Sequence, residues 1–395
     1  MLSSPEVRDL IMQTYGILRQ GVDKHLPTEV NAATRYALEQ NTFIFSGFKT
    51  YHSLRDVGLS LTKADGSIKP YADFQKDVER INATYNRHYL RAEYQHAVGS
   101  SLMAARWQQI EADGDKYDLQ YRTAGDERVR DEHAILDGTT LPPSDPFWSR
   151  YLPPNGWGCR CTAVQVRRGK YPQSDPALAM ERGNHCTAAP KQQIFRFNPG
   201  KDLKIFPPKH PYLPKGCGGC ELKKRIRLAT PVDKMLPQCR ACGEIFKLCL
   251  ANSKKRINQW RDENLPSMSS VLDIENTTLC SGSLLLTRGS IRNTMGHTLN
   301  LSVRNTLPDT PNQVKNWKYI GWFKCKEDPA TGKPKHPEAE YFLYYEMKIG
   351  GKTYYANVKA NKDLKREELY CIRDRLNLAK INNGVPPNIA DYKKK

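Results

Sequence analysis

The chain has 395 residues, of which 39% are hydrophobic and 26% are charged, a composition that can build two or three folded domains. No stretch approaches the length of a membrane span, and the N-terminus lacks the basic and apolar regions of a signal peptide, so we expect an intracellular protein. The formal net charge of +19 is unevenly placed: residues 1–190 carry 23 basic and 23 acidic residues, residues 191–250 carry 13 and 4, and residues 251–395 carry 25 and 15. This basic second half favours a polyanionic partner, and nucleic acid is the partner we expect.

The first part of the chain has helical patterns. Residues 3–45 are expected to be helical up to a break at Phe43–Gly47. Pro70 suits the first position of a longer helix, where no amide hydrogen is needed. Apolar and aromatic residues then recur at steps of three and four, which is typical of a packed helix face: Phe74, Val78, Ile81, Tyr85 and Tyr89. The Gly-Ser-Ser run at 99–101 is expected to bend this helix.

The last part of the chain alternates strand-like and helical runs. Its aromatic and β-branched stretches predict four strands: Ser283–Thr287, Tyr319–Lys324, Tyr341–Ile349 and Lys352–Lys359. A helix is expected at Lys365–Leu378, and the tail that follows is expected to fray.

Residues 121–161 form a loop-dense block with glycine turns, a Pro-Pro-Asn-Gly reversal and two tryptophans that can cover a small core. Cys159 and Cys161 are two positions apart, so in an extended segment both thiols face the same side. Other histidine and cysteine side chains could complete a tetrahedral zinc site with them: His133, His185 and Cys186. The alternative is that both cysteines are small buried residues without a metal.

This block resembles the phage Mu protein F-like head morphogenesis (minor capsid) family. The resemblance covers about residues 40–210 and is carried by several motifs: Tyr85–Asn86, Tyr89–Tyr94, Tyr121–Arg130, His133, Leu136–Gly138, Asp145–Trp148, Pro153–Cys161 and Phe195–Pro199. It implies a virion or procapsid protein that acts in head assembly, has portal or capsid proteins as partners, and is present in the host cytoplasm during assembly. It does not imply catalysis. The set Asp126, Arg128, Arg130 and His133 could be taken for an enzyme site, and we interpret it as a structural ion-pair and hydrogen-bond network.

Two cysteine pairs follow the block. Cys217 and Cys220 form one Cys-x-x-Cys pair, Cys239 and Cys242 form another, and 18 residues separate the pairs. This spacing is typical of a four-thiolate zinc knuckle, in which a structural metal folds a segment too short to hold its own core. Disulfides are the alternative, and they would require an oxidising compartment. A basic run at 223–227 lies between the pairs and is equally consistent with nucleic-acid binding or with solvation.

The C-terminal part weakly resembles the barnase–EndoU–colicin–RelE-like nuclease domains of phages. The resemblance rests on a Ser-Ile-Arg-x-x-x-x-His run that ends at His297, a Lys335-His336 pair, and a tyrosine-rich hairpin. It implies metal-independent RNA cleavage, in which a base removes the 2′-hydroxyl proton, an acid protonates the leaving 5′-oxygen, and cations stabilise the phosphorane.

Candidate catalytic residues follow from this resemblance. His297 and His336 suit the two proton-transfer roles, because histidine titrates near neutral pH. Arg292, Lys335 or Lys359 could stabilise charge, and Tyr345 could stack on a base or donate a hydrogen bond. The alternatives are a helix-terminal surface histidine at 297 and a solvated loop histidine at 336.

Two other interpretations of the C-terminal part stay open. It could bind DNA or a head partner without catalysis, which its charge alone would explain. It could also be an interbacterial-type toxin.

The sequence therefore predicts a multidomain α+β fold. Its expected parts are a helical and loop-rich head morphogenesis domain, a small zinc-knuckle segment, a basic nuclease-like α+β domain with an antiparallel sheet, and a flexible tail. Their expected boundaries are 1–210, 211–250, 251–380 and 381–395.

Overall fold

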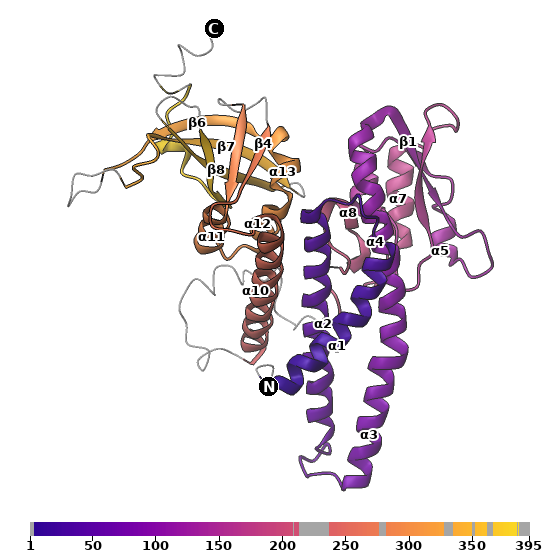
Figure 1. The fold of residues 1–395 in the computed structure, drawn as a ribbon. Coiled ribbons are helices and arrows are strands. Elements are labelled where there is room, and N and C mark those ends of the chain that lie inside the picture. Colours follow the sequence, from indigo (N-terminus) through magenta and orange to yellow (C-terminus); the bar gives the residue numbers. More distant parts are fainter. Residues whose placement is uncertain are drawn as a thin grey trace. The chain divides into compact units, whose positions relative to one another are not determined.

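The computed structural model describes residues 4–207, 209–212, 237–275, 282–327, 335–349, 352–361 and 366–384, with residue 386. It divides into two compact units, each described here by itself (Figure 1). Unit 1 comprises Met1–Val30 and Thr34–Cys249, and unit 2 consists chiefly of Leu250–Lys395. Within the described ranges, no helix is long and apolar enough to cross a membrane.

Unit 1 begins with long helices. They are α1 (Pro5–His25), α2 (Ala32–Ser60), α3 (Tyr71–Ala83) and α4 (Leu90–Asp113), with a π-helical segment at Thr84–Tyr89 between the last two. The Ser4 hydroxyl accepts a hydrogen bond from the Val7 amide and so caps α1. Pro70 lies directly before α3, one position earlier than we expected. α1 packs against α4, and later segments of the unit also contact α4.

The expected break at 43–47 is absent, because α2 continues through it. Phenylalanines on both sides of Gly47 are buried: Phe43, Phe45 and Phe48. Gly47 itself allows a close approach, since a Cβ there would lie 3.0 Å from Ile245 of α10 (Pro237–Asn264). Tertiary packing therefore outweighs the low helix propensity of glycine at this position.

The expected bend at 99–101 is also absent. α4 runs through these residues without interruption. The buried Ser101 hydroxyl donates to the Ala97 carbonyl at 2.6 Å, so the polar side chain is satisfied within the helix. The irregularity lies earlier, at the π-helical segment Thr84–Tyr89.

A small sheet follows the helices of unit 1. Its strands β1 (Tyr117–Arg122), β2 (Thr140–Leu141) and β3 (Thr162–Arg167) pair antiparallel in the order β2-β1-β3. Short helices surround it: α5 (Asp131–Ala134), α6 (Pro146–Tyr151), α7 (Pro176–Cys186) and α8 (Pro199–Asp202). Aromatic residues of the loop-dense block fill the core beneath the sheet: Tyr121, Phe147, Trp148 and Tyr151.

Unit 2 is built on a six-stranded sheet in the order β4-β5-β9-β8-β7-β6. The strands are β4 (Val271–Glu275), β5 (Ser283–Thr287), β6 (Lys318–Lys324), β7 (Tyr341–Ile349), β8 (Lys352–Ala360) and β9 (Glu367–Arg373). Helices α11 (Arg288–His297), α12 (Leu301–Thr306) and α13 (Thr310–Gln313) connect β5 to β6. The four expected strands are present, and the α+β class is confirmed.

Two predictions for this sheet are wrong. The sheet is mixed rather than antiparallel, because β5 and β9 run parallel. The stretch expected to be helical at Lys365–Leu378 contains β9 instead. Its residues include good helix formers, but Leu369 and Ile372 are fully buried in the sheet core and the strand pairs with β8. Burial and strand pairing thus override local helix propensity.

In the sheet of unit 2, alternate side chains along a strand are buried on one face. On β7, the odd-numbered residues Tyr341, Leu343, Tyr345 and Met347 belong to the hydrophobic core of unit 2. Ala356 and Val358 of β8 join the same core. Even-numbered residues of β7, such as Phe342, therefore lie on the opposite face, where the candidate site of unit 2 is found.

A buried ion pair joins two helices of unit 1. The Lys49 ammonium forms a hydrogen-bonded ion pair with Glu93 and also donates to the Tyr85 carbonyl at 2.8 Å. The Tyr212 hydroxyl donates to the other carboxylate oxygen of Glu93. Both charged side chains are almost fully buried, so each depends on the other for compensation.

We expect Lys49→Ala to destabilise the protein by about 3–5 kcal/mol, because it leaves the Glu93 carboxylate buried without a counter-charge. Lys247→Ala is the matched control: its pair with Glu244 is exposed, so the expected cost is about 0–1 kcal/mol. Urea unfolding of the three proteins measures the difference. Equal midpoints for the two variants would show that the buried pair is not required.

Candidate functional site

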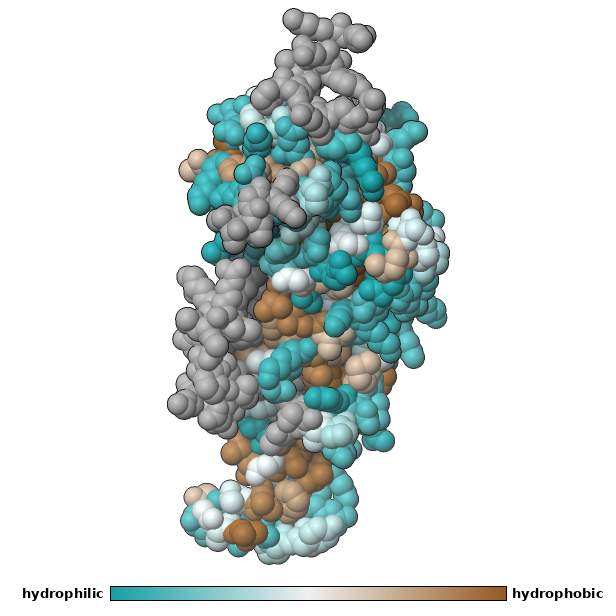
Figure 2. All heavy atoms as spheres, turned by 60° about the vertical axis from the view of Figure 1, so that its left-hand side comes forward, coloured by the Kyte–Doolittle hydropathy of each residue, from teal (hydrophilic) through white to brown (hydrophobic). Residues whose placement is uncertain are grey.

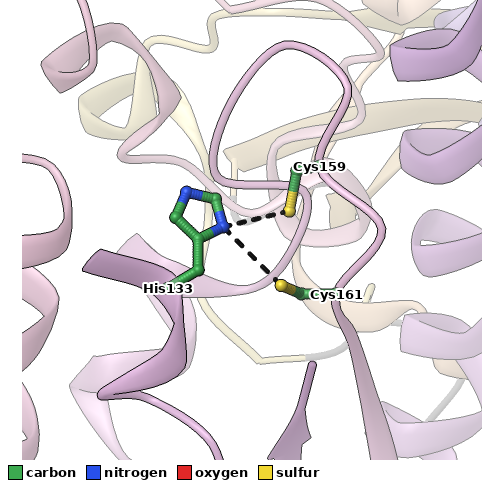
Figure 3. Close-up of side chains that lie close together, drawn as sticks. All are labelled: His133, Cys159 and Cys161. Atoms are coloured by element: carbon green, nitrogen blue, oxygen red, sulfur yellow. Dashed lines mark hydrogen bonds between the residues drawn. The ribbon is translucent and has the colours of Figure 1, made fainter. Parts of the chain in front are cut away.

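Three side chains that could hold a metal ion converge in the loop-dense block of unit 1, and we call them the metal-binding group for this capacity. His133 lies on α5, Cys159 lies in the loop after α6, and Cys161 directly precedes β3 (Figure 3). The His133 Nδ1 atom is 3.5 Å from the Cys159 sulfur and 3.6 Å from the Cys161 sulfur. All three ligand atoms lie within 4.8 Å of one another, so this group could hold a metal ion.

Local structure explains why these side chains meet. Gly158 has a φ of +69°, which a residue with a Cβ rarely adopts, and it turns the chain immediately before Cys159. The pairing of Arg122 with Thr162 places Cys161 beside the end of β1. His133 is only 2% exposed, and its Nε2 atom has no hydrogen-bond partner in the described part of the chain.

The two thiols interact in a way that suits metal ligation. A hydrogen bond from the Cys161 thiol lowers the pKa of Cys159, and the same contact, together with burial, raises the pKa of Cys161. Cys159 is therefore the thiol that ionises first, with Cys161 as its donor. A divalent metal would replace the shared proton, since thiolates are the ligand form of cysteine.

Charged residues around the group connect two loops, residues 126–130 and residues 157–160. Arg160 forms two hydrogen bonds of 2.6 Å with the Asp126 carboxylate, and these lower the pKa of Asp126 to about 2. Arg130 donates to the Trp157 carbonyl at 2.6 Å. Both contacts cross from residues 126–130 to residues 157–160, which is the arrangement of a structural network.

The remaining predicted metal ligands have different positions. His185 is exposed near the end of α7, and Cys186 is buried at its last residue. Cys217 and Cys220 of the predicted knuckle lie outside the described residues. Cys239 belongs to α10, although its side chain is outside the described set, and Cys242 is buried in the same helix.

A second cluster forms in unit 2 around Tyr370 of β9. The His297 Nε2 atom, at the end of α11, is 3.4 Å from the Tyr370 hydroxyl. The His336 ring meets the Tyr370 ring edge-on, with 5.2 Å between centroids. Phe342 contacts both rings, at 5.3 Å from His336 and 5.5 Å from Tyr370. Two predicted catalytic histidines thus contact a single tyrosine.

Ion pairs border this cluster. The Lys359 ammonium lies 5.7 Å from the Tyr370 ring centre and pairs with Glu338 at 2.6 Å and with Glu368 at 3.8 Å. The His336 Nδ1 atom is 3.6 Å from Glu338. The positive charge of Lys359 is therefore compensated by two carboxylates, and its ion pairs link Glu338 to Glu368 of β9.

Arg373 supplies a different kind of positive charge. Its guanidinium donates to the Cys371 sulfur at 3.2 Å, and it forms no ion pair among the described residues. Burial lowers the pKa of His297, and the charge of Arg373 lowers it further. Arg373 is thus a cation close enough to His297 to lower its pKa, and no carboxylate pairs with it in the described ranges.

Three predicted catalytic residues are not brought into the cluster. Tyr345 is fully buried in the core on the opposite face of β7, where its hydroxyl lies 3.5 Å from a Glu367 oxygen. Arg292 and Lys335 are exposed, and neither side chain has a hydrogen bond or ion pair with the cluster in the described ranges. The alternation of β7 explains the position of Tyr345, since its neighbours 344 and 346 face the other way.

Sequence reasoning missed Tyr370, the centre of the cluster. Leu369 pairs with Val358 while Cys371 pairs with Asn357, so Tyr370 is the extra residue of a β-bulge. A helix had been expected there, which would have directed this side chain differently. Apolar residues at every second position, Leu369 and Cys371 on either side of Tyr370, were the sequence pattern that indicates a strand.

The stretch that holds the metal-binding group matches a known family. Residues 65–164 match the family model of phage Mu protein F like protein. The resemblance noted from the sequence is therefore confirmed, over a shorter range than the expected 40–210. His133, Cys159 and Cys161 fall inside the match, whereas unit 2 lies outside it.

Two curated relatives support the same assignment. The chain is 38% identical over 86 residues to the Mu-like prophage FluMu F protein of Haemophilus influenzae, which covers 20% of this chain and 21% of that protein. It is 42% identical over 59 residues to the putative capsid assembly protein F of Escherichia phage Mu, which covers 15% and 13%. The matches thus span about a fifth or less of each relative. No solved structure matches the chain.

Proposed function

We propose that this protein is a phage minor head protein that acts in capsid assembly, with portal or capsid proteins as its partners and the virion or procapsid as its location. The family match at residues 65–164 carries this proposal. The name of the phage Mu relative, a putative capsid assembly protein, supports it.

An apolar surface at the tip of the α2–α3 hairpin suits a protein partner. Four large side chains are exposed there: Leu59 (66%), Leu61 (40%), Ile68 (72%) and Tyr71 (77%). Figure 2 shows apolar side chains gathered at the lower end of the molecule, where Figure 1 places this hairpin. Clustered exposed apolar residues commonly mark interaction sites.

The metal in unit 1 is zinc in this proposal, and its role is structural. Two cysteines and a histidine are the ligand types that zinc prefers. The group lies beside buried aromatic residues and joins α5 to the segment that enters β3, so a metal there would stabilise the loop-dense block.

We expect His133→Ala to lower the zinc content of the purified protein by about one equivalent per chain, because a site that loses its imidazole ligand holds zinc weakly. His88→Ala is the matched control, since His88 is exposed on the π-helical segment and should leave zinc unchanged. Elemental analysis of protein purified without chelator measures both. Wild-type protein without zinc would contradict the metal assignment.

We expect Leu59→Asp combined with Ile68→Asp to reduce incorporation of the protein into phage heads severalfold, because charge at the hairpin tip opposes an apolar contact. Quantitative immunoblotting of purified heads measures incorporation. The control is Met268→Asp, an exposed apolar residue in unit 2. Equal incorporation of all three proteins would show that the tip is not a contact surface.

A second candidate function is RNA cleavage by unit 2. The contact of both His297 and His336 with Tyr370 favours it, since acid–base cleavage needs two proton-transfer groups near one phosphate. His297 suits the base, because burial and Arg373 keep it neutral at lower pH than an ordinary histidine. His336, beside Glu338, suits the acid, and Arg373 suits the cation that stabilises the phosphorane.

We expect the full-length protein to cleave RNA in EDTA, and His297→Ala or His336→Ala to lower the rate by about 10²–10⁴-fold. His88→Ala is the control for histidine loss outside the site. Arg373→Ala should lower the rate. It should also shift the acidic limb of the pH–rate profile to higher pH, because removing the positive charge raises the pKa of His297. Salt-sensitive RNA binding without cleavage would favour a binding role instead.

A further inference from the structure

The metal-binding group of unit 1 has three ligand atoms, whereas structural zinc sites are closed by four protein ligands. A fourth ligand must reach the group from a nearby element. Two kinds of candidate exist: another cysteine or histidine, or a solvent molecule from the small cavity of about 60 Å³ that borders Arg128, Arg130 and the group. The position and burial of Cys186 favour a cysteine over a solvent molecule.

Cys186 is the cysteine that the fold brings toward the group. It is the last residue of α7, and α7 packs against α5, which carries His133. Cys186 is 3% exposed and belongs to the hydrophobic cluster against which Cys161 packs. No hydrogen bond engages its sulfur among the described residues. Among the described residues, a buried thiol with no hydrogen-bond partner thus lies in the core that Cys161 also contacts, at the end of the helix that packs against α5.

Arg130 lies beside the metal-binding group, because it lines the small cavity together with His133, Cys159 and Cys161. Three thiolates and one imidazole around a divalent metal leave a net charge of −1, which Arg130 can offset.

We propose that Cys186 is the fourth ligand, so that the site is a closed Cys₃His centre. This inference rests on the zinc centre proposed above. The Cys186 sulfur lies outside the group of three, so ligation would require it to move closer to the metal as its thiol proton passes to solvent. The bond would fasten the end of α7 to α5 and to the segment before β3. It would also exclude water from the metal, as expected of a structural site.

The test uses full-length protein in which Cys217→Ser and Cys220→Ser prevent metal binding at the predicted knuckle. We load it with cobalt(II), which reports thiolate ligands by charge-transfer absorbance, and compare it with the same protein carrying Cys186→Ala. The expected loss is about a third of that absorbance, together with about 100-fold or greater weakening of zinc affinity. His185→Ala, at the exposed neighbouring position, should change neither.

The outcomes separate the inference from the zinc proposal. Metal bound by the parent protein but unchanged by Cys186→Ala would overturn Cys186 as a ligand and leave the zinc centre with an open fourth position. A parent protein that binds no metal would overturn both. If Cys186→Ala does not fold, X-ray absorption of the zinc-loaded parent decides: three sulfurs and one nitrogen support the inference, and two sulfurs contradict it.

Discussion

The antiparallel pairing of β1 with β3 fixes the geometry on which the metal-binding group depends. The register runs from Tyr117 opposite Arg167 to Arg122 opposite Thr162, so the chain enters β3 beside the point where β1 ends. Residues that leave β1 and residues that approach β3 are therefore neighbours. A slip of one residue would turn Cys161 to the other face of the strand and separate it from His133.

Burial of the aromatic residues makes that register stable. Tyr121 of β1 and Ala163 of β3 face each other in the same core as Trp148 and Tyr151, all fully buried. The Tyr121 hydroxyl donates to the Asn155 side chain at 2.9 Å, which anchors the Pro-Pro-Asn-Gly reversal to the strand. Core and loop thus stabilise one another, and a metal would act on a site that the packing has already assembled.

The sequence predicted what depends on local pattern and missed what depends on long-range packing. The Cys159 and Cys161 pair and His133 were found because spacing and residue type suffice to identify possible ligands. The strands with aromatic alternation were found for a similar reason. β9 was missed because the Lys-Arg-Glu-Glu sequence at 365–368, which leads into it, favours a helix locally, while its partner β8 and the buried Leu369 determine its structure. The continuous α2 was missed because the contact of Gly47 with Ile245 joins residues far apart in the chain. The bulge at Tyr370 also depends on the pairing of β9 with β8, which the local sequence does not reveal.

The ion pairs around Tyr370 change how the basic excess of unit 2 is interpreted. The basic excess suggested that lysines at the site would meet a polyanion, yet Lys359 is paired with Glu338 and Glu368. Under the proposed nuclease function, the cations available to a phosphate would be Arg373, whose charge lowers the pKa of His297, and exposed side chains such as Arg292 and Lys335. A cation held by two carboxylates orders the site, whereas one without a carboxylate partner can attract a phosphate. Net charge alone could not have distinguished the two roles, because both contribute equally to it.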